Sequence, residues 1–149
     1  MRAVVQRVAQ AEVRVGDRQT GSIGEGLMVL LGIDKNDCSD DVAWMADKLV
    51  HLRIFEDTAG LMNRSLLDTG GAMLIVSQFT LLGDCRKGRR PSWSSAAAPD
   101  LANVLYLELV QAVRSYGVVA ATGEFQAMMN VALVNSGPVT LLLDSQKNF

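Results

Sequence analysis

The chain has 149 residues, 49% of them hydrophobic and 20% charged, with a formal net charge of −2. This size and balance predict a single globular domain over residues 1–149, and the small negative charge gives no overall signal for nucleic-acid binding. The longest uninterrupted apolar runs, such as residues 27–31, are far shorter than the ~20 residues that cross a bilayer. We therefore expect no membrane contact.

The cysteine and histidine content narrows the possible chemistry. Cys38 and Cys85 lie far apart in a chain with no signal-peptide pattern, which predicts reduced thiols in the cytoplasm. His51 is the only histidine, and there is no Cys-x-x-Cys motif, so a metal site has little to build on. We expect neither a metal nor another cofactor.

The first part of the chain predicts strands. Residues 2–8 have strand character and residues 12–15 alternate with period two, so we expect a hairpin at the start, with Gly16 in a turn after it. Residues 27–33 are apolar enough for a central strand, and residues 34–37 are expected to form a polar loop.

A first helix is predicted after this loop. Ser39 is the expected N-cap, with acidic residues in the first turn that favour the helix dipole. His51, near the helix end, is interpreted as structural or solvated rather than catalytic. A short strand at 52–55 and a turn at 56–60 are expected next. The buried helix face is expected to contain Val42, Met45, Ala46 and Leu49.

The segment 72–81, Ala-Met-Leu-Ile-Val-Ser-Gln-Phe-Thr-Leu, is the most informative. Its initial apolar run predicts a strand buried on both faces. Ser77, Gln78 and Thr80 then follow in quick succession around Phe79. Small hydroxyls and an amide at the end of a buried strand can point donors into a pocket. The alternative is that these groups only satisfy the backbone at the strand end.

A cluster of positive charge follows this segment, and it consists of Arg86, Lys87, Arg89 and Arg90. Such a run is often a solvated loop. On a weakly acidic chain, however, so dense a cluster also suits phosphate binding. Local charge alone leaves both interpretations open.

The last third predicts a second helix and further strands. The helix is expected to begin at Pro99 and to end before Gly117, and a strand is expected at 118–121. Met128 and Met129 are interpreted as core residues rather than ligand contacts. The apolar stripe of the helix is expected to contain Leu101, Val104, Leu105, Leu109, Ala112 and Val113.

A second polar motif, Asn-Ser-Gly-Pro-Val-Thr at 135–140, separates strands predicted at 128–134 and 139–143. Proline cannot donate a ladder hydrogen bond, so Pro138 does not belong inside a central strand. A hairpin turn is one explanation. The other is a rigid loop that displays its carbonyl groups, with a cis bond between Gly137 and Pro138.

Together the two motifs resemble those of the D-aminoacyl-tRNA deacylase (D-tyrosyl-tRNA deacylase) family. The likeness is carried by Ser-Gln-Phe-Thr-Leu at 77–81 and Asn-x-Gly-Pro-Val-Thr at 135–140. Trp93 stands where phenylalanine is expected, and Ser136 where aspartate is frequent, but neither departure touches the motif cores. The likeness covers nearly the whole chain, with further matching stretches at 1–8, 62–66, 88–92 and 123–129.

The resemblance implies an α/β fold with a three-layer ββα arrangement, sheets packed on each other in a barrel-like way, two main helices outside, and a homodimer. It also implies hydrolysis of the ester bond of D-aminoacyl-tRNA to free amino acid and tRNA, a chiral proofreading step. Because glycine has no side chain to exclude, glycyl-tRNA mischarged on tRNA-Ala is expected to be a substrate too.

The resemblance also implies a mechanism. No histidine or cysteine adjoins Thr80, which would therefore be a poor nucleophile. Members of this family are understood to let the 2′-hydroxyl of the terminal adenosine help to activate water. The N–H groups around Phe79 and Thr80 are then the candidates for stabilising the oxyanion, while Gln78 and Ser77 hold the ribose and the α-amino group.

Selectivity is implied to come from the second motif. Gly137 and Pro138 would project two carbonyl groups into the active site of the other subunit and leave no room for an L side chain. Arg7 is expected to support this loop, and Asn135 is grouped with it as a supporting residue. The resemblance also favours tRNA phosphate binding by the cluster at 86–90.

Three rival functions also fit some of these residues. In the first, Thr80 attacks the ester and forms an acyl-enzyme; in the second, the basic cluster binds tRNA without catalysis; in the third, the strand end binds a free amino acid. Two intact motifs favour the deacylase over the last two. Release of D-tyrosine but not L-tyrosine from tyrosyl-tRNA would discriminate among them.

Overall fold

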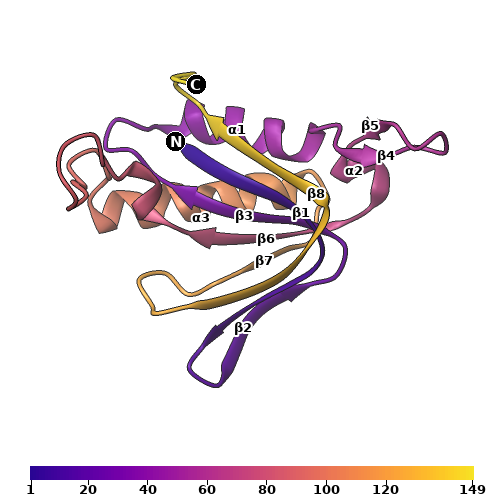
Figure 1. Cartoon of the computed structure of the whole chain (residues 1–149), viewed down its shortest axis with the longest axis horizontal. Coiled ribbons are helices and arrows are strands. Elements are labelled where there is room, and N and C mark those ends of the chain that lie inside the picture. Colours follow the sequence, from indigo (N-terminus) through magenta and orange to yellow (C-terminus); the bar gives the residue numbers. More distant parts are fainter.

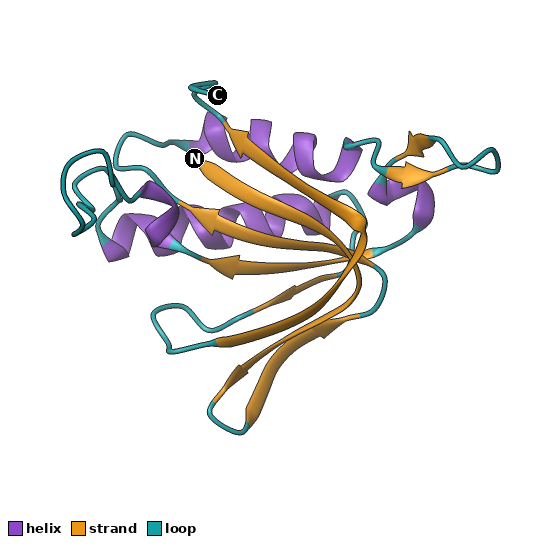
Figure 2. Cartoon of the chain, in the orientation of Figure 1, coloured by secondary structure: helices purple, strands orange, loops and turns teal.

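The computed structural model describes residues 1–149 as one curved β-sheet with two long helices packed on one of its faces (Figure 1; Figure 2). A separate two-stranded sheet lies at one end of the molecule. In chain order the elements are β1 (Arg2–Val15), β2 (Arg18–Ile23), β3 (Gly26–Gly32), α1 (Ser39–His51), β4 (Phe55–Glu56), β5 (Met62–Arg64), α2 (Leu66–Thr69), β6 (Ala72–Ser77), the 3₁₀ helix η1 (Phe79–Leu82), α3 (Pro99–Ser115), β7 (Ala120–Thr122) and β8 (Asn130–Asp144).

Strand β1 belongs to two parts of the sheet. Its first half pairs antiparallel with β3, its second half with β2, and β8 runs along its other side. The predicted hairpin within residues 2–15 is therefore wrong, and the first turn comes at Gly16, with φ +58°. Arg7 and Val8 are both buried, so the in–out alternation of side chains slips there. Because of this bulge, the hydrophobic pattern of one long strand resembles that of two shorter strands.

The centre of the sheet is parallel and buried on both faces. Strand β3 pairs with β6, and β6 with β7. Alternate residues such as Val29 and Ile75 pack with the helices, whereas Met28, Leu74 and Val76 face the inside of the curve. The predictions of a central strand at 27–33 and a doubly buried strand after residue 72 are confirmed.

The sheet nearly closes into a barrel where β2 approaches β7. A Cβ at Gly21 would collide with the backbone of Thr122, so this approach requires glycine. The fold is thus a mixed α/β structure with a barrel-like sheet, as expected. Two details differ: the main strands form one curved sheet rather than stacked sheets, and there is a third, single-turn α-helix.

Helix α1 has the predicted buried face, but its cap lies one residue earlier. Cys38 is the N-cap, and Ser39 is the first helical residue. The carboxylate of Asp41 accepts a hydrogen bond of 3.0 Å from the Cys38 N–H, which secures the first turn.

Helix α3 begins at Pro99 and ends before Gly117 as predicted. The N-terminal part of its apolar stripe differs from expectation because Leu101 and Val104 are exposed. The first turns of this helix lie at the rim of a pocket rather than over the sheet, since Pro99 and Ala102 both line that pocket. The buried residues are Leu105, Tyr106, Leu109, Val110 and Val113.

Strand β8 is continuous, so the separate strands predicted at 128–134 and 139–143 are in fact one, and the hairpin explanation of the motif between them is wrong. Gln6 pairs with Thr140 and Val8 with Asn135, which leaves Arg7 alone opposite residues 136–139. This bulge lets β8 carry Pro138 without a missing ladder bond.

The segment between α1 and β6 was predicted least well. Residues 52–54 are not a strand, because the Leu52 N–H still bonds to the helix at Lys48 O, and β4 contains only Phe55 and Glu56. Strand β5 and helix α2 were not predicted. Helix α2 is held by a capping box in which the Asp68 carboxylate accepts from the Ser65 N–H at 2.8 Å. None of the helices is long and apolar enough to cross a membrane.

Candidate active site

The end of strand β6 opens into a pocket of about 820 Å³. Ser77 is the last strand residue, Gln78 leaves the sheet, and the chain turns into η1. All four motif residues, Ser77, Gln78, Phe79 and Thr80, line this pocket. The prediction that they lie together at a pocket is therefore confirmed, whereas their catalytic roles remain predictions.

A glycine on the neighbouring strand makes this turn possible. The Gln78 N–H donates the last bond to β3, to Leu31 O at 2.7 Å. A Cβ at Gly32 would lie 3.0 Å from Gln78 O and would press on the side chain of Leu82. The absence of a side chain at Gly32 therefore lets η1 pack closely over the end of β3.

The polar groups at the start of η1 divide into paired and free ones. The Gln78 side-chain amide donates to the Thr80 hydroxyl oxygen. The backbone N–H groups of Phe79 and Thr80 open the 3₁₀ helix, where the first N–H groups have no intrahelical acceptor. These two N–H groups can donate to an oxygen atom of a ligand.

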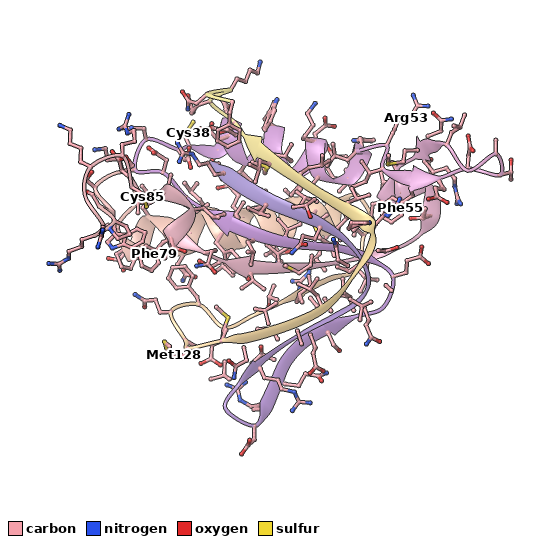
Figure 3. All side chains as sticks on the ribbon, in the orientation of Figure 1. Cys38, Arg53, Phe55, Phe79, Cys85 and Met128 are labelled. Atoms are coloured by element: carbon pink, nitrogen blue, oxygen red, sulfur yellow. The ribbon has the colours of Figure 1, made fainter.

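The opposite wall of the pocket comes from distant segments. Trp93 precedes α3, while Phe125, Met128 and Met129 lie on the connection to β8. Met128 is 91% exposed, so its assignment to the core is wrong, and Figure 3 shows it on the same side of the molecule as Phe79. It lies outside the sheet because β8 begins only at Asn130.

Tyr106 supports this wall from the core. Its hydroxyl donates to Ile75 O on β6 at 2.8 Å, and its ring lies 6.1 Å from that of Phe125. Burial raises the pKa of Tyr106 to about 12. The phenol is therefore a neutral donor that links α3 to the strand ending at the pocket.

No titratable side chain lines the pocket: its polar side chains are those of serine, threonine, glutamine and tryptophan. His51 is exposed on α1, where its Nδ1 lies 3.1 Å from an Asp47 carboxylate oxygen, in agreement with its non-catalytic interpretation. Cys38 and Cys85 are exposed and also lie outside the pocket lining. The protein thus offers no obvious general base here.

The basic cluster forms an exposed loop after η1. The guanidinium of Arg86 donates two hydrogen bonds to the carboxylate of Asp84, from Nε at 2.9 Å and from Nη2 at 2.7 Å. This hydrogen bonding holds the pKa of Asp84 well below its usual range. Lys87, Arg89 and Arg90 have no acidic partner within 4.0 Å. The loop therefore presents three unpaired cations, whereas the charge of Arg86 is already balanced.

The second motif lies elsewhere in this chain. Gly137 and Pro138 are exposed on the bulge of β8, their bond is cis, and neither lines the pocket. Arg7 lies beneath the bulge, with Nε 3.2 Å from Ser136 O and Nη1 2.6 Å from Ile54 O. Asn135 pairs with β1, and its buried Oδ1 has no hydrogen-bond partner.

Comparison with known proteins decides the family. The sequence profile described as D-Tyr-tRNA(Tyr) deacylase matches residues 4–144. The chain belongs to this family. It is 59% identical to a D-aminoacyl-tRNA deacylase of Syntrophotalea carbinolica and 58% identical to one of Thermosipho africanus, with both chains covered completely in each comparison. The protein is therefore an ester hydrolase that deacylates D-aminoacyl-tRNA.

Solved structures agree with the fold. A structure described as the c-Myc DNA Unwinding Element Binding Protein superimposes with a TM-score of 0.91 at 38% identity, covering 97% of this chain and 98% of that one. A probable eukaryotic D-amino acid tRNA deacylase superimposes with a TM-score of 0.80 at 21% identity, covering 95% and 97%. At this identity the second likeness supports the fold alone.

Two aromatic residues of the pocket were not proposed from the sequence. Trp93 had been noted only as a departure from the family pattern, and Phe125 only as part of a matching stretch. Both lie far in sequence from the 77–80 motif, and only the packing of α3 and the connection before β8 brings them to it. The signal that could have found Trp93 is its position directly after the basic cluster.

Proposed function

We propose that this deacylase relies on its substrate to activate the attacking water. The observation that carries the proposal is the absence of a titratable group from a pocket lined by all four residues of the 77–80 motif. Ester hydrolysis needs a group that accepts the proton of water. The 2′-hydroxyl of the terminal adenosine adjoins the ester and can assist where the protein has no base.

In this mechanism the protein supplies position and charge stabilisation. The N–H groups of Phe79 and Thr80 donate to the oxyanion of the tetrahedral intermediate, and fixed donors of this kind contribute several kcal/mol elsewhere, ~2.7–4 for one donor. Gln78 and Ser77 hold the ribose and the α-amino group. The Thr80 hydroxyl already accepts from Gln78, so its role is to orient that amide rather than to attack.

Chiral selectivity is assigned to Gly137 and Pro138 of a second subunit. Both residues lie outside the pocket of their own chain, so their carbonyl groups can act only on a neighbour's pocket. There they would occupy the space that an L side chain requires, while a D side chain or glycine is accommodated. Glycyl-tRNA mischarged on tRNA-Ala is accordingly a second substrate.

The exposed edge of β8 supports the homodimer that this requires. The strand pairs only with β1 and is a long edge, with Val134 and Leu142 50% and 61% exposed, which in an isolated chain would favour unwanted strand pairing. A second subunit would cover this edge.

The test uses three substrates: D-tyrosyl-tRNA, L-tyrosyl-tRNA, and D-tyrosyl-tRNA with a 2′-deoxy terminal adenosine. We expect release of tyrosine from the first alone. Loss of the 2′-hydroxyl should slow hydrolysis by about 10²–10⁴-fold, the usual contribution of a general base, with binding nearly unchanged. Rapid hydrolysis of the 2′-deoxy substrate would reject substrate assistance, and sedimentation of the protein as a monomer would reject the intersubunit filter.

A further inference from the structure

Two aromatic rings stand exposed at the mouth of the pocket. Phe79 is 53% and Trp93 41% exposed, and their ring centroids lie 5.4 Å apart in an edge-to-face arrangement. Exposed aromatic residues that adjoin a binding pocket can provide area for a ligand to cover. The indole N–H of Trp93 has no hydrogen-bond acceptor in the chain, so hydrogen bonding within the chain does not explain the position of the ring.

The position of Trp93 is nevertheless fixed. One edge of its six-membered ring rests on Gly83, where a Cβ would lie only 2.6 Å from the ring. Asp84 and Ser92 exchange two backbone hydrogen bonds of 2.8 and 3.0 Å immediately before it, and Trp93 O accepts from the Ala96 N–H at 3.0 Å. A ring held in this way can stack on a ligand without a large cost of ordering.

Positive charge lies on the same loop. The Asp84–Ser92 pair closes a loop that carries Lys87, Arg89 and Arg90, none of which has an acidic partner. Proteins that bind single-stranded nucleic acid combine unpaired cations for the phosphates with aromatic rings for the bases. Both features occur here within residues 87–93, and Trp93 of this segment lines the pocket.

We propose that Trp93 is a base-stacking residue for the single-stranded 3′ end of tRNA, with Lys87, Arg89 and Arg90 binding the adjacent phosphates. The inference rests on the proposed function, in which the esterified 3′ end enters this pocket. Trp93 is a positioning residue: it holds the RNA end so that the ester meets the N–H groups of Phe79 and Thr80, and it takes no part in the chemistry.

Tryptophan fluorescence tests this directly, because the chain contains only Trp44 and Trp93. Trp44 lies on α1, where Lys48 covers its ring at 5.6 Å, so Trp44→Phe leaves Trp93 as the sole reporter without altering the pocket. The probe is the uncharged RNA oligonucleotide ACCA, and an abasic oligomer of equal length carries the same phosphates without bases. We expect saturable quenching by ACCA and none by the abasic oligomer.

Substitution separates stacking from packing. Trp93→Leu should weaken ACCA binding by about 5- to 150-fold, the usual range for loss of one aromatic–base stack. Trp93→Phe keeps a ring and should stay within about tenfold of the native protein. For D-tyrosyl-tRNA, Trp93→Leu should raise KM by a similar factor with kcat changed little.

Three outcomes would overturn the proposal: no quenching by ACCA, equal quenching by the abasic oligomer, or equal weakening by Trp93→Phe and Trp93→Leu. The last would indicate lost packing on Gly83. Because ACCA carries no ester, these measurements do not depend on hydrolysis. Failure of the proposed mechanism would appear instead as rapid hydrolysis of the 2′-deoxy substrate by the native protein.

Discussion

Arg7 and Ser136 connect the first strand to the bulge of the last: Arg7 Nε donates to Ser136 O at 3.2 Å, directly before Gly137. Arg7 is 7% exposed, and its guanidinium also donates to Ile54 O at 2.6 Å. A Cβ at Gly137 would collide with it, so the bulge rests on this side chain. Arg7 is thus in a position to determine where the Gly137 and Pro138 carbonyl groups lie.

Arg7→Lys should loosen the bulge while leaving the pocket intact. An ammonium group cannot reproduce the fork that reaches both carbonyl oxygens, so one acceptor is left unpaired at a cost of about 1–3 kcal/mol. The free energy of unfolding should fall by that amount in urea. If the bulge filters the substrate, hydrolysis of L-tyrosyl-tRNA should rise relative to that of D-tyrosyl-tRNA.

Arg14→Lys is the matched control, because Arg14 lies on the same strand but is only half-buried and is paired only with Glu12 and the Asp17 carbonyl. It should change neither the stability nor the selectivity appreciably. An Arg7→Lys protein that was destabilised yet fully selective would show that Arg7 supports the fold without governing the filter.

Thr80→Val should retain catalysis. The backbone N–H of residue 80 is unaffected, and the substitution removes only the hydroxyl that accepts from Gln78. We expect kcat/KM within about tenfold of the native value, whereas loss of a true nucleophile costs about 10⁴-fold or more. Mass spectrometry of the native protein during turnover provides the second measurement. An acyl group on Thr80 would contradict the prediction.

The fold could be predicted where hydrophobic pattern alone determines it. Strands β3 and β6 are short apolar runs buried on both faces, and α1 and α3 have clear helical periodicity. Prediction failed at bulges, because Arg7 and Val8 break the alternation of β1 and Pro138 suggested that β8 was interrupted. At both places tertiary pairing with a neighbouring strand overrides the local signal.

The site was predictable in part for a similar reason. Ser77 to Thr80 are adjacent in sequence, so one motif reveals them. Trp93, Phe125 and Met128 come together only through the packing of segments distant from that motif, which no local pattern specifies. The pairing of Arg86 with Asp84 likewise depends on the conformation of the loop, so charge counting treated four cations as equivalent when one is neutralised.

The difference between the paired Arg86 and the unpaired cations of the loop gives a prediction for tRNA binding. Arg89→Gln removes an unpaired cation and should make the plot of log affinity against log salt shallower by roughly 0.7–0.9. Arg86→Gln should change the slope less, since Asp84 already balances that charge at 2.7 Å. Asp84→Asn should do the opposite and steepen the slope by freeing Arg86.

Binding is best measured with uncharged tRNA over a range of KCl concentrations. Each of the three variants differs from the native protein by one charge, and the substituted residues lie on the same loop. The variants therefore serve as controls for one another. Equal slopes in all three proteins and the native one would mean that the loop does not meet phosphates.

Tyr106 should make the protein sensitive to high pH. Burial raises its pKa to about 12 from an ordinary value of 10.0, so the folded state holds the phenolic proton more tightly than the unfolded chain does. The resulting stabilisation is fully present below pH ~10 and is lost as the pH rises toward ~12. A difference of this size corresponds to about 3 kcal/mol.

Urea unfolding between pH 8 and 11.5 measures this pH-dependent part of the free energy of unfolding. In Tyr106→Phe the hydrogen bond to Ile75 O is lost, which should lower stability by ~0.5–1.5 kcal/mol at pH 8, and the decline above pH 10 should become shallower. Tyr116→Phe removes the other tyrosine, which is 41% exposed, and should keep the native pH profile. If Tyr106→Phe lost stability as steeply as the native protein at high pH, the alkaline decline would have to come from other groups. The phenol that joins α3 to β6 would then have the same pKa in the folded and the unfolded protein.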